Sequence, residues 1–267
     1  MVEISTHVGK VRVDSVGAGP PVVLLHATLH DRHDYDPIIA GLAGRFTAIA
    51  VDWPGHGDSA ALPDGVRAGG PLFARVLEEV LAELDLPSAA FIGNSVGGFA
   101  AAHIAITQPE RVRALVLVNS AGFTPQTLVT RSFCRLLGSP AIARRVLPRM
   151  VPTYMKARTD SDRTIVSRAV ARCRTDEGIE LAAALWRSFA APAYDLRPQA
   201  ARITAPTLLP WGSKDAVLPL RAGRATHAAI AGSALIPFDT GHVVFSSDPE
   251  GFLAEVLPFL EKAFAAG

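Results

Sequence analysis

A single serine stands between glycines in the stretch FIGNSVGGFA, residues 91–100. Ser95 follows an apolar run and precedes a segment with the pattern of a helix, which places its hydroxyl on a strand-to-helix turn. Gly93 and Gly97 stand two residues before and after it, where side chains would collide with neighbouring backbone in a sharp turn. A helix start also favours a developing negative charge. These features indicate a nucleophilic serine.

Two other interpretations of this stretch are a phosphate-binding loop and a structural turn in which Ser95 caps a helix. The phosphate loop is disfavoured because no Gly-Lys-Ser/Thr follows, and no acidic residue stands at the spacing of a dinucleotide fingerprint. A helix cap explains the serine, although it does not explain glycines on both sides.

A serine hydroxyl becomes a strong nucleophile only when a base takes its proton and a third group orients that base. Asp215, in WGSKDAVLP, and His242, in FDTGHVVF, each follow an apolar run typical of a buried strand. The carboxyl ends of neighbouring strands in an open α/β sheet converge on one crevice, so residues distant in sequence can meet there. The sequence therefore offers partners in the chain order Ser95, Asp215, His242.

Histidines and aspartates also gather between residues 26 and 36, which raises the alternative of a metal site. No known zinc spacing is matched, and the segment should bend from strand through loop into helix, which separates the side chains. We therefore expect no metal, and we expect no organic cofactor.

Short apolar runs alternate with amphipathic stretches along much of the chain. Helices are expected over residues 72–84 and 250–264, and KVRVDSV alternates like an antiparallel edge strand. This order predicts an α/β fold with a mostly parallel twisted sheet and helices on both faces. The runs expected to form its buried strands are residues 22–27, 46–53, 89–95, 113–120, 205–211 and 233–238.

The alternation stops between residues 123 and 203, where helix-like segments follow one another. We expect a helical cap there, inserted into a core domain made of residues 1–122 and 204–267. The inserted region holds 13 Arg and one Lys against four Asp and two Glu, a net charge of +8. Most of these arginines are expected to face solvent, with the alternative that a few turn inward to bind an anionic substrate.

The composition excludes several classes of partner. The 26 basic and 25 acidic residues give a net charge of +1, so we expect neither nucleic acid nor an anionic membrane as a partner. Signal-like and membrane-spanning apolar stretches are not found, which makes a cytoplasmic location the expectation. Cys134 and Cys173 are expected to be free and structural. The sequence leaves open whether the chain forms a homo-oligomer.

Five stretches in this order resemble the α/β-hydrolase fold family: VVLLHATLH, AVDWPGHGDSA, GNSVGG, WGSKDAVLP and TGHVVFSSDPEGFL. The resemblance implies that Ser95 is the nucleophile, His242 the general base and Asp215 the carboxylate that orients it. It also implies an oxyanion hole from the backbone N–H groups of Val96 and Thr28. His26 would support this loop, in which Ala27 stands where the family usually has glycine.

The resemblance implies a hydrolase of a small or medium ester, lactone or β-dicarbonyl compound, acting through an acyl-enzyme or a related intermediate. Two alternatives use the same fold: a cofactor-free perhydrolase or haloperoxidase, and a non-catalytic receptor for small molecules. The substrate pocket should be largely apolar. Its expected contributors are His30, Phe133, Tyr154, Trp186, Phe189, Tyr194 and Val243.

Overall fold

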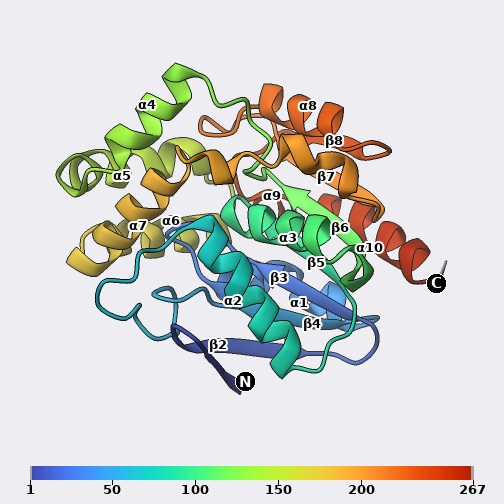
Figure 1. Cartoon of the computed structure of the whole chain (residues 1–267). Coiled ribbons are helices and arrows are strands. Elements are labelled where there is room, and N and C mark those ends of the chain that lie inside the picture. The colour runs from blue at the N-terminus through green and yellow to red at the C-terminus, as the bar shows by residue number, and fades with distance from the viewer. Residues whose placement is uncertain (1, 266–267) are drawn as a thin grey trace.

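The predicted apolar runs form the parallel part of one eight-stranded sheet in the computed structural model, which describes residues 2–265 (Figure 1). The strand order is β1-β2-β4-β3-β5-β6-β7-β8. The six parallel strands are β3 (Pro21–Leu25), β4 (Thr47–Val51), β5 (Ala89–Asn94), β6 (Val112–Val118), β7 (Thr207–Gly212) and β8 (Ala234–Phe238).

The antiparallel part of the sheet differs from the prediction. KVRVDSV lies in β2 (Gly9–Val16), which is antiparallel as expected but pairs on both sides, with β4 and with β1 (Val2–Thr6). The edge strand at this end of the sheet is therefore β1. Only one of its five side chains, Ile4, is buried, so the sequence carries little of the apolar signal that marks a strand.

Helices cover both faces of the sheet, as predicted. Alternate side chains of β3 divide between two cores, because successive residues of a strand point to opposite faces. Val23 and Leu25 pack in the core that includes α2 (Gly70–Glu83) and α3 (Val96–Thr107). Val22 and Leu24 pack in the core that includes α1 (Asp36–Ala43) and α10 (Pro249–Ala265). The remaining helices of this part are α8 (Leu220–Ala229), α9 (Val244–Ser247) and the short 3-10 helices Arg32–Tyr35 and Pro109–Arg111.

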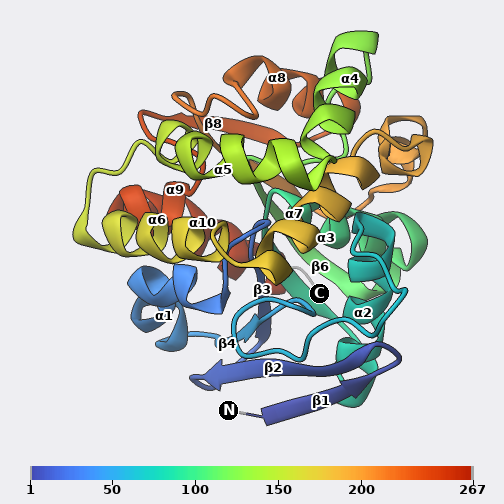
Figure 2. The same cartoon turned by 90° about the vertical axis from the view of Figure 1, so that its left-hand side faces the viewer.

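The long connection between β6 and β7 contains the helices of the predicted cap. Figures 1 and 2 show these helices gathered at one end of the sheet. They are α4 (Leu128–Leu137), α5 (Pro140–Met155), α6 (Asp160–Arg172) and α7 (Asp176–Ser188), followed by the 3-10 helices Pro192–Tyr194 and Arg197–Arg202. Within residues 2–265, no helix is both long and apolar enough to cross a membrane.

Candidate active site

Ser95 lies in a strained turn between β5 and α3. Its φ of 55° and ψ of −115° place the backbone in a conformation that residues with a side chain rarely adopt. A Cβ atom on Gly93 would lie 2.6 Å from the carbonyl oxygen of Gly97, and one on Gly97 would lie 2.1 Å from that of Leu25. The predicted need for glycine at both positions is therefore confirmed, and the turn presents the serine hydroxyl at the carboxyl end of the sheet.

The structure brings His242 and Asp215 together at that same end. His242 Nδ1 lies 2.5 Å from Asp215 Oδ2, and the other carboxylate oxygen accepts the N–H of Val217 at 2.7 Å. Burial would raise the pKa of Asp215, but the imidazole and these hydrogen bonds bring it below its ordinary value. An ionised carboxylate only accepts hydrogen bonds, so Nδ1 carries the proton in the neutral ring and Nε2 is the free acceptor.

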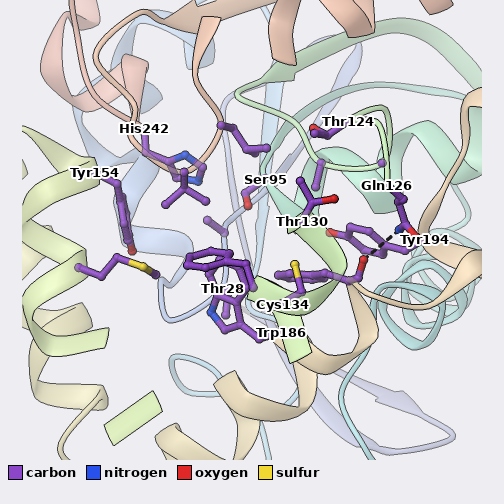
Figure 3. Close-up of a pocket in the computed structure, with 18 of the residues that line it drawn as sticks. Thr28, Ser95, Thr124, Gln126, Thr130, Cys134, Tyr154, Trp186, Tyr194 and His242 are labelled. Carbon is purple, nitrogen blue, oxygen red and sulfur yellow. Dashed lines mark hydrogen bonds between the residues drawn. The ribbon is translucent and has the colours of Figure 1, made fainter. Parts of the chain in front are cut away.

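Ser95 and His242 line one cavity (Figure 3). Figure 3 marks no hydrogen bond between the serine hydroxyl and the imidazole. Such a bond often tightens only when substrate binds, so the arrangement suits a nucleophile and a base that align in the complex.

The predicted oxyanion hole involves the backbone N–H groups of Val96 and Thr28. Val96 is the first residue of α3, so its N–H has no acceptor within the helix. Thr28 lines the cavity on the loop after β3. Positive φ in this loop falls on Leu29, at 72°, and not on Ala27, so alanine replaces the family's glycine without strain.

Two buried histidines hold this loop. His26 Nδ1 lies 2.7 Å from the carbonyl oxygen of Ala27, and its Nε2 accepts the N–H of Trp53 at 3.1 Å. His56 Nε2 accepts the N–H of Leu29 at 3.3 Å. Burial lowers the pKa of both rings, most strongly for His56, so each remains neutral with one donor and one acceptor nitrogen. The expected support of the loop by His26 therefore has a structural basis.

The cavity has a volume of about 150 Å³ and mostly apolar walls. All five aromatic residues expected in the substrate pocket line it: Phe133, Tyr154, Trp186, Phe189 and Tyr194. His30 and Val243 do not line it. His30 lies behind Tyr154, with its Nε2 at 3.1 Å from the tyrosine hydroxyl and its Nδ1 bonded to Asp34. Val243 turns into the core, because α9 begins directly after it.

The histidine-rich segment spreads its side chains, as its predicted bend requires. His26 faces Trp53, His30 faces Asp34, and His33 is exposed beside Asp36. These three rings therefore have different partners, an arrangement that does not suit one metal ion.

Two site residues were not predicted in these roles. Asn119 lies at the end of β6, where its Nδ2 donates to Asp215 Oδ2 at 2.8 Å and its Oδ1 accepts the N–H of Gly212 at 2.7 Å. It thus fixes the Asp215 carboxylate, and its only sequence signal is a polar residue at a strand end. Cys134, expected to be structural, lines the cavity. Burial raises its pKa to about 11, which keeps the thiol neutral.

Most cap arginines face solvent, as expected. Arg131 is the one that lines the cavity with Ser95. The ten exposed ones are Arg135, Arg144, Arg145, Arg149, Arg158, Arg163, Arg174, Arg187, Arg197 and Arg202.

Comparisons relate the chain to known proteins. A family described as alpha/beta hydrolase fold matches residues 20–249. The pimeloyl-[acyl-carrier protein] methyl ester esterase of Neisseria meningitidis serogroup C is 30% identical over 254 residues, which cover 90% of this chain and 93% of that protein. The enol-lactonase from Burkholderia xenovorans LB400 has a TM-score of 0.82 at 21% identity, covering 97% of this chain and 100% of the other. A bromoperoxidase from Bacillus anthracis has a TM-score of 0.79 at 21% identity, covering 95% and 96%. The two structural likenesses show the fold.

Proposed function

The chain belongs to the alpha/beta hydrolase family, and from this premise we propose that it is a serine hydrolase that cleaves small or medium carboxylic esters or lactones. The observation that carries the proposal is His242, which lines the cavity that also holds the strained Ser95 and has Asp215 Oδ2 at 2.5 Å from its Nδ1. The esterase relative from Neisseria meningitidis supports an ester as the substrate class.

In the proposed reaction, Ser95 Oγ attacks the substrate carbonyl carbon while His242 Nε2 takes the hydroxyl proton. The carbonyl oxygen becomes an oxyanion and accepts hydrogen bonds from the N–H groups of Val96 and Thr28. Loss of one such donor typically slows an enzyme about 10²- to 10³-fold.

The tetrahedral intermediate then collapses. His242 gives its proton to the leaving alcohol oxygen, the carbon–oxygen bond breaks, and an acyl group remains on Ser95. A water molecule attacks this acyl-enzyme with His242 again as the base, which releases the acid and restores the serine. Asp215 stays ionised throughout and stabilises the imidazolium that forms in each step.

The proposal predicts that a serine-directed organophosphonate adds once to the wild-type protein. Intact-mass spectrometry measures the adduct, with Ser95→Ala and His242→Ala as the comparison proteins. Turnover is then measured on short-chain aryl esters, lactones and dienoates, and Ser95→Ala should lower kcat by at least about 10⁴-fold, since the triad acts as a unit.

Two results would count against the proposal. A folded protein that takes no adduct and hydrolyses none of these compounds would favour a receptor with the same fold. Peroxide-dependent halogenation that exceeds ester hydrolysis would identify a perhydrolase, in which peroxide replaces water as the acyl acceptor.

A further inference from the structure

The hydroxyl of Tyr194 is a buried hydrogen-bonding group without a partner. The residue is 6% exposed, lines the cavity, and its Oη makes no hydrogen bond among residues 2–265. Figure 3 shows this hydroxyl directed into the cavity, on the side toward Ser95. The Oγ1 atoms of Thr28 and Thr124, which also line the cavity, are likewise buried without a partner among residues 2–265. Buried polar groups are rarely left unpaired, so unpaired hydroxyls in a ligand cavity point to polar groups on the ligand.

The ring of Tyr194 is fixed by its neighbours, so its hydroxyl has no alternative position. It stacks on Phe99 at a centroid distance of 4.4 Å and an interplanar angle of 7°, and Phe189 lies against it at 4.6 Å. A Cβ atom on Gly70 would lie 2.7 Å from the ring, which shows how closely the backbone approaches. Burial also holds the pKa of the phenol well above 10, so it remains a hydrogen-bond donor.

Arg131 adds a positive charge to the same cavity. Its Nε donates to the carbonyl oxygen of Ala190 at 3.4 Å, four residues before Tyr194. Within residues 2–265, no carboxylate lies within 4.0 Å of its guanidinium, whereas Arg144, Arg158, Arg163, Arg168 and Arg197 of the cap all form ion pairs. No Asp or Glu is among the residues that line the cavity. A negatively charged ligand group would therefore meet attraction and no repulsion.

We propose that Tyr194 and Arg131 form a subsite for a carboxylate on the part of the substrate remote from the scissile carbonyl. This inference rests on the proposed function and narrows its substrate class to esters or lactones that carry a free carboxylate, such as half-esters of short dicarboxylic acids. The phenol donates one hydrogen bond to the carboxylate, and the guanidinium supplies further donors and the opposite charge.

Three methyl esters of similar shape test the subsite. Monomethyl glutarate carries a distal carboxylate, methyl 5-oxohexanoate carries a neutral acceptor there, and methyl hexanoate carries an ethyl group. We expect wild-type kcat/KM for monomethyl glutarate to exceed that for methyl hexanoate by roughly 10- to 100-fold. Tyr194→Phe should lower kcat/KM for both polar esters relative to kcat/KM for methyl hexanoate. Arg131→Gln should lower this relative value for monomethyl glutarate only. Arg135→Gln, an exposed arginine on the same helix, should leave the ratios unchanged.

The outcomes separate this inference from the proposed function. Turnover of all three esters with no preference for monomethyl glutarate, or a preference that survives both variants, would overturn the subsite and leave the hydrolase proposal standing. If the wild type hydrolyses none of them, calorimetry on Ser95→Ala still tests the subsite. Binding of monomethyl glutarate that is tighter than that of methyl hexanoate, and is weakened by Arg131→Gln, supports it, and equal binding overturns it.

Discussion

Residue types reveal the proposed reacting groups of this site more clearly than they reveal the residues that hold these groups in position. Ser95 and His242 stand in short stretches with a glycine pattern or a strand end beside them, and these signals need no knowledge of the packing. Asn119 has no such signal, because an amide at a strand end is common and its partners Asp215 and Gly212 lie more than 90 residues away. Val243 shows the opposite error, since adjacency to His242 in sequence does not put it in the cavity.

The cap arginines show the same limit of prediction from sequence, which does not extend to the role of a single residue. The sequence predicts a basic segment with mostly solvated arginines, and it cannot tell Arg131 from the other twelve. That distinction depends on the path of α4 over the cavity, where only one of its arginines reaches the lining.

The two neutral histidines that hold the loop after β3, His26 and His56, predict a pH dependence of stability. Burial lowers the pKa of His26 and of His56 in the folded protein below their ordinary value of 6.5. As pH falls through 6.5, the unfolded chain binds protons that the native protein does not, so the free energy of unfolding decreases. Each ring contributes a slope of at most about 1.4 kcal/mol per pH unit.

Urea unfolding at pH 7.5 and at pH 5.5 measures this effect. The lowered pKa values of the buried carboxylates Asp34 and Asp215 act below about pH 4, outside this window. We expect His56→Gln to make the decrease between the two pH values smaller, and His33→Gln, at an exposed histidine, to leave it unchanged. An equal decrease in the wild type and in His56→Gln would show that this ring does not remain neutral in the fold.

At the scale of elements, the sequence predicts the positions of the parallel strands and fails at the two edges of the sheet. The run at residues 233–238, expected to be a buried strand, forms the edge strand β8, in which only Phe238 is buried. Buried strands such as β5 carry apolar side chains on both faces, so their runs are continuous and easily recognised. β1 and α1 each bury few side chains, only Ile4 in the first and two of eight residues in the second, which weakens the periodic signal. The element that matters most for the site, the strand-turn-helix around Ser95, is also the one with the most specific sequence.

That turn predicts a large difference between two Gly→Ala substitutions. Gly97→Ala would put a Cβ atom 2.1 Å from the carbonyl oxygen of Leu25, so either β3 or α3 must move. We expect a loss of stability on the order of 3 kcal/mol, and loss of activity in any protein that folds. Gly44 has open space around its Cβ position and a helical φ of −67°, so Gly44→Ala should be neutral or stabilising by up to about 1 kcal/mol. Urea denaturation compares the stability of the two variants. Equal unfolding midpoints would refute the close approach between Gly97 and the carbonyl oxygen of Leu25.

At the scale of the whole molecule, the cap is bonded to the chain on both sides of His242. Before it, Arg158 pairs with Asp239, and the N–H of His242 donates to the carbonyl oxygen of Tyr154 at 3.0 Å. After it, the carboxylate of Asp162 in α6 accepts hydrogen bonds from the hydroxyl groups of Ser246 and Ser247. At the far end of the cap, α4 buries only Leu137, while Leu128 and Val129 are 83% and 77% exposed. We therefore expect local unfolding to be easiest in α4, because few of its apolar side chains are packed against the rest of the protein.

Asp162 and Asp160 give a matched test of the contact between the cap and the segment after His242, since both lie in the first turn of α6. Asp162 is fully buried and also accepts the N–H of Arg158 at 2.8 Å, so its carboxylate joins α6 to α9 without an ion pair among residues 2–265. Asp162→Asn replaces one acceptor oxygen with a donor, which leaves a serine hydroxyl or the amide unsatisfied.

We expect Asp162→Asn to lower the free energy of unfolding by about 1 to 3 kcal/mol. Amide hydrogen exchange in α6 and α9 should become faster, while exchange in α4 stays as fast as in the wild type. Asp160→Asn removes only an exposed pair with Arg163 and should change stability by less than about 0.5 kcal/mol. If exchange in α9 responds equally to the two substitutions, the cap does not hold the histidine loop through Asp162, and the position of His242 must then depend on its bonds to Asp215, Tyr154 and Asn94.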